Sequence, residues 1–180
     1  MVLIAQWFQP TVDISLRGVQ EQFDNLAEEV KRTLAATNPN HSLFGEPSPA
    51  IPARLSSSLW APAECRSVVE AIAAVVGPTF NRDFEQYFVK ENSFINLVLE
   101  RRQGIPITLC VTVQAVARRL GVLLETISFP RHFLLRWLEH PMKQGIKRFT
   151  FVDPFNKNFS LSFDEVVETF SIPQVSPGRW

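Results

Sequence analysis

The chain has 180 residues, of which 46% are hydrophobic and 20% are charged, as expected for one folded domain and not for a disordered chain. Lys+Arg and Asp+Glu are equal at 18 each, so the net charge is zero, and this argues against broad electrostatic binding of nucleic acid. The only two cysteines, Cys65 and Cys110, offer neither a disulfide framework nor metal-ligand spacing, so no metal and no cofactor are expected.

The N-terminal stretch MVLIAQWF is too short for a secretory signal and lacks a basic lead. No apolar run approaches the ~20 residues that span a bilayer. We therefore expect no membrane association and a reducing compartment, the cytoplasm or the nucleus.

An N-terminal helical segment is predicted over residues 1–36. Residues 1–8 resemble the end of a helix that Pro10 stops, and five apolar residues in it are expected to pack on other parts of the protein: Val2, Leu3, Ile4, Trp7 and Phe8. A second helix is predicted over 16–35, with Asp13 or Ser15 as its N-cap. Its apolar residues recur three and four apart and form one stripe: Leu16, Val19, Phe23, Leu26, Val30 and Leu34.

Residues 37–62 are rich in Pro, Ser and Asn and predict a long surface loop. The main domain is then expected over 63–171. It begins with a helix over 63–76 that Gly77-Pro78 closes. A shorter helix follows over 94–102, with Asn92 or Ser93 as its cap.

The centre of the domain is predicted to be a buried helix over 107–120, because its residues are apolar nearly all round. Three antiparallel strands follow, with the sequences VLLETISF, HFLLRWL and KRFTFVD. A capping box, Ser162 to Glu165, begins a last helix over 163–170, and 172–180 is expected to be a disordered tail. The order predicts an α+β fold with a buried central helix on an antiparallel sheet and peripheral N-terminal helices.

His132 and Asp153 fit two of the three positions that a cysteine hydrolase needs. Such enzymes place the thiol at a helix N-terminus, a histidine base on a facing strand, and an acid or amide on the next strand. Alternation puts His132, Leu134 and Arg136 on one face of their strand. The pair is therefore either catalytic, live or relic, or a hydrogen-bonded part of the core.

Cys110 is a poor candidate for the nucleophile. It lies about one turn inside the central helix, among apolar neighbours that would raise the pKa of its thiol. Buried free cysteines usually behave as small hydrophobic residues. Thr108 and Ser93, the nearest hydroxyls, resemble helix caps, and Cys65 is expected on a surface helix outside the core.

Three segments carry a family resemblance: NSFINLVLERRQGIPITLCVTVQAVARRLGV, FPRHFLLRW and FVDPF. Together they resemble the transglutaminase-like domain of the bacterial SirB type, whose core is cysteine-proteinase-like. The upstream PTVDISLRGVQEQFDNLAEEVKRTL is similar to animal F-box members of this family, and the likeness covers roughly residues 4–170. It implies that the usual catalytic cysteine is replaced by Pro106, while His132 and Asp153 match the family's His and Asp.

The resemblance further implies a non-catalytic domain that recognises a protein or peptide substrate for a Skp1–cullin–F-box ubiquitin ligase. The chain itself is expected to be a fragment or short form without the F-box, and so not to bind Skp1 alone. Arg131, Arg136 and Trp137 are expected to line the cleft. Two alternatives stay open: a working cysteine hydrolase or acyl-transferase that uses Cys110, His132 and Asp153, and a structural module whose loop 38–62 carries the interaction.

Overall fold

A computed structural model of the chain describes residues 2–45, 51, 57–81, 89–129, 132–141, 147–156 and 159–170. The helices are α1 (Val2–Phe8), α2 (Leu16–Thr37), α3 (Pro62–Thr79), α4 (Ile95–Arg101), α5 (Pro106–Arg119) and α6 (Phe163–Phe170). The strands are β1 (Glu125–Phe129), β2 (His132–Pro141), β3 (Lys147–Val152) and β4 (Ser160–Leu161). The short 3₁₀ helices are Ser42–Phe44 and Lys90–Ser93. The fold is therefore mixed α+β, as the sequence predicts.

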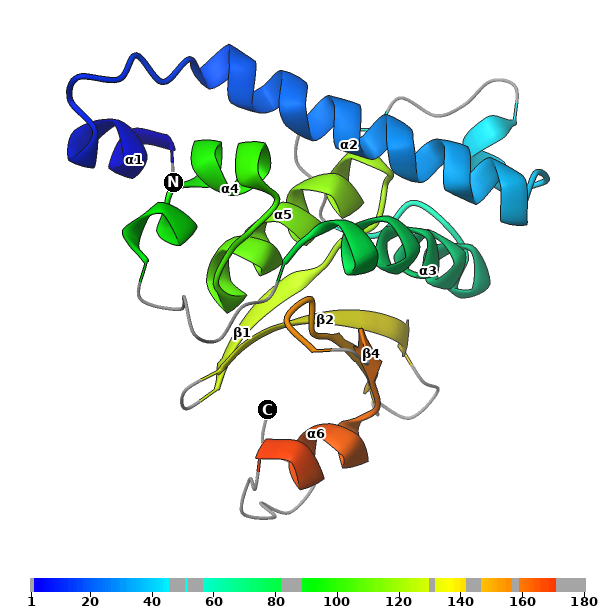
Figure 1. Cartoon of the computed structure of the whole chain (residues 1–180). Coiled ribbons are helices and arrows are strands. Elements are labelled where there is room, and N and C mark those ends of the chain that lie inside the picture. Colours follow the sequence, from blue (N-terminus) through cyan, green and yellow to red (C-terminus); the bar gives the residue numbers. More distant parts are fainter. Residues whose placement is uncertain are drawn as a thin grey trace.

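The sheet is an antiparallel meander in which each strand pairs with the next in the chain, in the order β1-β2-β3-β4. Helices α2 to α5 cover one face of it and α6 lies on the other (Figure 1). β2 supplies both faces because its side chains alternate. Leu135 and Trp137 belong to the core beneath the helices, whereas Leu134 joins a smaller cluster with Phe151 and Val166 on the α6 side.

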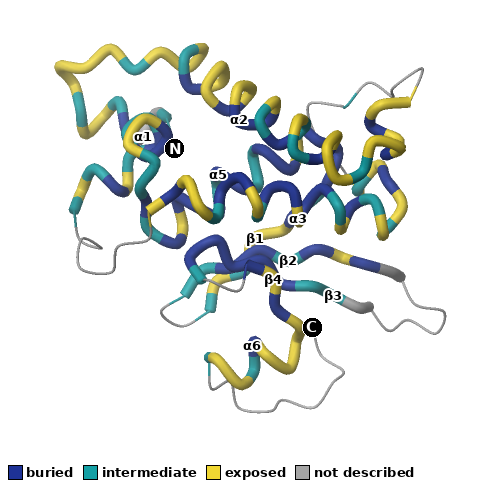
Figure 2. Tube along the Cα trace, turned by 45° about the vertical axis from the view of Figure 1, so that its right-hand side comes forward, coloured by how far each residue is buried: buried dark blue, intermediate teal, exposed yellow. Residues whose placement is uncertain are grey.

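The central helix α5 carries the main core, as its composition predicts. Leu109, Val113 and Val116 are fully buried, and Figure 2 shows α5 as a mostly dark tube between α3 and the sheet. Pro106 occupies the first helical position, where a missing N–H costs nothing. Thr108 closes the first turn, since its hydroxyl accepts from Ile105 N at 3.0 Å and donates to Asn92 O at 2.9 Å.

Helix α2 confirms the predicted apolar stripe except at its first residue. Five of the six residues are buried, while Leu16 is exposed because it lies at the open end of the helix. Ser15 is the N-cap, and its Oγ accepts from Gly18 N at 3.1 Å. The last turn continues to Thr37, two residues beyond the prediction.

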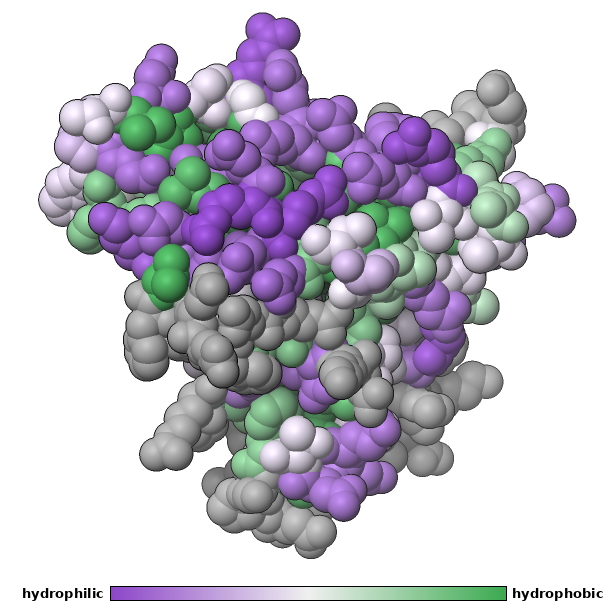
Figure 3. Space-filling model, in the orientation of Figure 1, coloured by the Kyte–Doolittle hydropathy of each residue, from purple (hydrophilic) through white to green (hydrophobic). Residues whose placement is uncertain are grey.

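The prediction that the apolar residues of 1–8 pack on other parts of the protein holds for Val2, which packs against the core, but Trp7 and Phe8 stay largely exposed. Trp7 is 82% exposed and Phe8 70% exposed, although the Phe8 ring is stacked against Phe94 at 6.3 Å. In Figure 3 apolar side chains interrupt the hydrophilic surface at this end of the helical layer. Only Ala5 of this short helix is buried, because seven residues present a single narrow face; the side chains of Leu3 and Ile4 lie outside the described part.

Two helix boundaries differ from the predicted ones. Helix α3 runs through Gly77-Pro78 to Thr79, past its predicted end, and Phe80 N still donates to Val76 O at 3.0 Å. The N-cap of α4 is Phe94, which makes no side-chain cap bond. Asn92 and Ser93 lie in the preceding 3₁₀ helix instead.

Most described residues of 37–62 are exposed or half-buried and irregular, as composition predicts, but three side chains of the segment reach the core. His41, Leu43 and Trp60 are buried. Trp60 Nε1 donates to Leu120 O at 2.6 Å, and Leu59 N donates to Gly121 O at 2.9 Å, so the end of this segment is fastened to the turn after α5.

Several predictions fall wholly or partly outside the described residues. Residues 46–50 and 52–56 of the loop, and the predicted tail over 172–180, lie there. The division into 1–36, 37–62 and 63–171 stays a prediction, although α2 shares one core with α3 and α5. Within the described helices, none is long and apolar enough to cross a membrane.

Gly121 generates a stability prediction. Its φ of 77° is left-handed, and an added Cβ would lie 2.7 Å from Trp60 Nε1. Gly121→Ala should therefore lower the free energy of unfolding by about 2–4 kcal/mol in a denaturant titration.

The matched control is Gly18→Ala, whose Cβ would lie an ordinary 3.5 Å from Ser15 Cβ. It should raise the stability by about 0.5–1 kcal/mol. If both substitutions changed the free energy of unfolding equally, Trp60 would not be packed against the α5–β1 turn as the structure shows.

Candidate functional site

The candidate site is built around His132 and Asp153. His132 is the first residue of β2, and Asp153 directly follows β3, its neighbour in the sheet. The structure brings the two side chains together, with His132 Nε2 2.9 Å from Asp153 Oδ2. Because a carboxylate only accepts hydrogen bonds, Nε2 carries the proton and donates it. In the neutral ring Nδ1 is then left with a lone pair.

Asp153 is a completely buried acid whose oxygens are both used. Its Oδ1 accepts from Phe155 N at 3.0 Å, while Oδ2 takes the imidazole. Its main-chain N donates to Phe159 O at 2.8 Å, which connects the end of β3 to the start of β4. A buried carboxylate held this way can orient an imidazole, as the acid of a catalytic triad does.

His132 lies on the α6 face of the sheet and shares it with Leu134 and Arg136, the grouping that alternation predicts. Leu134, two residues along β2, packs against Val166 of α6. The His132 ring stacks on Phe170 with centroids 4.6 Å apart and planes 28° apart. The side chain is consequently only 16% exposed. Phe170, the last residue of α6, therefore covers part of the imidazole.

Cys110 does not make the contact that a nucleophile needs. Its Sγ donates to the main-chain oxygen of Phe133 at 3.3 Å, and among the described residues no hydrogen bond joins it to His132. Burial raises the pKa of the thiol well above its ordinary range, and the nearby Asp153 carboxylate raises it further. The thiol is thus held protonated, as the apolar neighbours in the sequence predict.

The other positions considered for a nucleophile are a proline, a helix-capping threonine and a second buried cysteine. Pro106, at the position that the family resemblance assigns to the cysteine, is the first residue of α5 and has no reactive side chain. The Thr108 hydroxyl is committed to its helix cap. Cys65 is buried in the core and donates to Trp60 O at 3.4 Å, so its expected place on a surface helix is wrong. The cause is that α3 packs beneath the end of the 37–62 segment.

Of the predicted cleft residues, Arg136 and Trp137 lie on opposite faces of β2. Arg136 shares the α6 face with His132, where its Nε donates to Glu125 Oε2 at 2.7 Å and its guanidinium lies over the Phe149 ring. Trp137 points to the opposite face and is buried, with the Arg66 guanidinium 5.7 Å from its ring. Arg131 lies outside the described residues.

Sequence reasoning missed the contribution of α6. Phe170 lies four residues after the buried Val166, the spacing that places two side chains on one helix face. That spacing indicates an amphipathic helix, but not what the helix covers. As for metals, no cluster of three or more His, Cys, Asp or Glu that could hold an ion occurs in the described parts of the chain.

The chain is similar to one protein-family profile and to two groups of curated proteins. The profile described as the transglutaminase-like superfamily matches residues 17–176. The chain is 34% identical to human F-box only protein 21 over 91% of its own length, which is 26% of the human protein. It is 40% identical to a UPF0162 protein of Xylella fastidiosa over 62% of the chain and 36% of that protein. No solved structure matches it. The chain thus spans only about a quarter to a third of the curated relatives it matches.

The Cys110 geometry generates a reactivity prediction. In a Cys65→Ala variant, Cys110 is the only thiol, and the thiolate is the reacting form. Because burial raises the pKa of this thiol, alkylation by iodoacetamide near neutral pH should be slower than that of free cysteine by about two orders of magnitude or more.

The same variant unfolded in urea is the control, and it should react like free cysteine. A folded-state reaction faster than free cysteine, abolished by His132→Ala, would contradict the assignment of the thiol to the Phe133 carbonyl.

Proposed function

From the premise that this chain belongs to the transglutaminase-like superfamily, we propose that it acts as a non-catalytic, protein-binding domain. Its role is substrate recognition in an F-box subunit of a Skp1–cullin–F-box ubiquitin ligase. The observation that carries the proposal is the His132–Asp153 pair, which is intact but has no thiol or hydroxyl bonded to it among the described residues.

The ligase context rests on the F-box named in its animal relatives. The human relative is an F-box only protein, and this chain matches about a quarter of it. Recruitment of the ligase core is assigned to the F-box of such longer proteins. Binding of the client protein is assigned to the transglutaminase-like domain.

A binding role suits the chemistry of the α6 face of β2. The Nδ1 lone pair of His132 accepts a hydrogen bond, while the half-buried guanidinium of Arg136 supplies positive charge and further donors. Both groups are fixed, His132 by the buried carboxylate and Arg136 by Glu125 and Phe149. Preorganised donors and acceptors reduce the entropy that binding costs. An extended peptide along this face would displace Phe170 from the imidazole.

We expect substitutions on the α6 face of β2 to weaken binding of a client protein, and we expect the chain to show no enzymatic turnover of its own. His132→Ala and Arg136→Ala should each weaken client binding by about 5- to 30-fold, the loss that about 1–2 kcal/mol produces. Clients are identified as proteins whose recovery falls with both variants and whose ubiquitination in cells falls when the gene is deleted. Arg17→Ala, which removes an exposed α2 side chain paired with Glu21, is the matched control and should bind as the unaltered chain does.

The enzymatic alternative is tested in parallel by incorporation of an amine probe into a protein acceptor and by hydrolysis of an activated ester. Turnover should not exceed that of Cys110→Ala. Turnover that Cys110→Ala and His132→Ala both abolish would replace the proposal with an active acyl-transferase or hydrolase. Unchanged client recovery with both β2 variants would instead remove the α6 face as the binding surface.

A further inference from the structure

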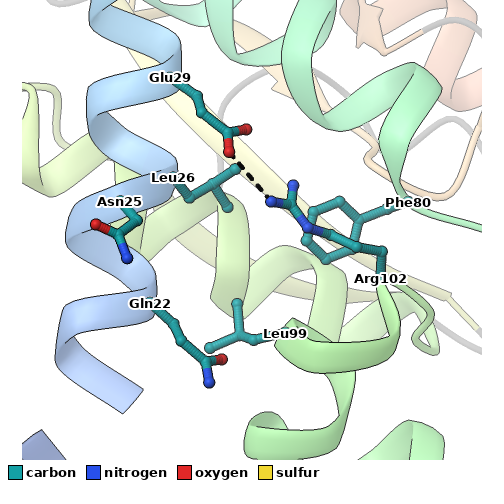
Figure 4. Close-up of a pocket in the computed structure, with 7 residues that line it drawn as sticks. All are labelled: Gln22, Asn25, Leu26, Glu29, Phe80, Leu99 and Arg102. Carbon is teal, nitrogen blue, oxygen red and sulfur yellow. Dashed lines mark hydrogen bonds and ion pairs between the residues drawn. The ribbon is translucent and has the colours of Figure 1, made fainter. Parts of the chain in front are cut away.

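A pocket of about 220 Å³ lies between α2, the end of α3 and the end of α4, away from every residue of the His132 site. Its seven lining residues are Gln22, Asn25, Leu26, Glu29, Phe80, Leu99 and Arg102. Figure 4 shows the Glu29 side chain of α2 pointing toward Arg102, and Gln22 further along α2 pointing toward Leu99. Leu26, Leu99 and Phe80 are buried and give the pocket apolar walls. The volume suits one small group and its attached hydrocarbon.

Arg102 adopts a backbone conformation that an arginine does not favour. Its φ of 51° and ψ of 42° are left-handed, at the C-cap of α4. A residue with a Cβ is disfavoured in this conformation, whereas glycine adopts it freely. Since glycine would relieve the strain, the presence of arginine points to a use for the guanidinium.

The guanidinium is positioned by two neighbours without being used up. It lies 5.2 Å over the Phe80 ring, and its Nη2 is 3.3 Å from Glu29 Oε1. Within the described part of the chain, its further side-chain hydrogen bond is a longer one, from Nη1 to Thr79 Oγ1 at 3.5 Å. Arginine has five N–H donors in a fork, so donors remain for a ligand. The side chains of Arg102 and Glu29 are each 36% exposed, so solutes can reach both.

The charges of the pocket select the ligand. One cation and one anion face the same space, so a carboxylate would approach Arg102 but be repelled by Glu29, and an ammonium would meet the reverse. A neutral amide has a carbonyl oxygen that accepts from a guanidinium and an N–H that donates to a carboxylate. It satisfies both charged groups and introduces no new charge into a partly apolar site.

We propose that this pocket binds the amide group of a peptide. The amide oxygen accepts from Arg102, the amide N–H donates to Glu29, and the attached aliphatic carbons lie on Leu26, Leu99 and Phe80. This binding site goes beyond the proposed function and does not rest on it, because none of its residues takes part in the His132 site.

The test is an NMR titration of the ¹⁵N-labelled chain with four small probes that share one aliphatic group: isovaleramide, N-methylisovaleramide, isovalerate and methyl isovalerate. The two amides should shift the side-chain signals of Arg102, Gln22 and Asn25, and the acid and the ester should not. A primary amide that binds better than its N-methyl form indicates an Asn or Gln side chain as the natural group. The reverse order indicates a peptide backbone.

Arg102→Gly is the decisive variant, because glycine keeps the left-handed backbone while the guanidinium is removed. Amide binding should weaken by about tenfold or more, the cost of losing a charged hydrogen bond. Arg101→Ala, which alters the exposed neighbour on α4, is the matched control and should bind the amides unchanged. The proposal is overturned if isovalerate shifts the same signals as strongly, if Arg102→Gly binds the amides unchanged, or if no amide shifts them.

Discussion

The hydrogen bond between the His132 imidazole and the buried Asp153 carboxylate is the interaction on which the rest of the site depends. A carboxylate with no exposure is costly unless its oxygens are paired, and here one oxygen takes Nε2 and the other takes Phe155 N. The bond joins the start of β2 to the end of β3. The same bond therefore fixes which ring nitrogen of His132 carries the proton and holds the start of β2 against the end of β3.

The central helix approaches this pair from the other side of the sheet and does not complete it. Cys110 reaches the main chain of β2 at Phe133, where its thiol has a partner and stays protonated. Helix α5 begins at Pro106, so its positive N-terminal end supports no thiolate. Among the described residues, neither Pro106 nor Cys110 places a reactive group against the imidazole. We propose that the pair instead presents fixed polar groups to a protein.

Periodic patterns in the sequence predict much of the fold. The stripe that ends at Leu34 and the apolar run of α5 identify two of the helices that form the core. The Ser162–Glu165 box begins α6 at the predicted residue, with Glu165 N donating to Ser162 Oγ at 3.3 Å. These signals are local. The strand order also brings His132 to Asp153, because neighbouring strands of a meander pair with each other.

What the sequence does not predict depends on contacts between distant segments. Trp60 lies in a stretch whose composition indicates a loop, yet its indole is bound to the end of α5. The two-residue strand β4 is too short to have a period. The cover of Phe170 over His132 and the meeting of Arg102 with Glu29 likewise arise from packing, which no spacing along the chain encodes.

The most direct measurement of the central claim is the ¹⁵N spectrum of the His132 ring at neutral pH, recorded for the chain and for Cys110→Ala. We expect a proton on Nε2 and ring signals that Cys110→Ala leaves in place, because the thiol is bonded to the Phe133 carbonyl. A Nδ1 signal that moves when the thiol is removed would show that the imidazole and Cys110 are partners and would contradict the assignment.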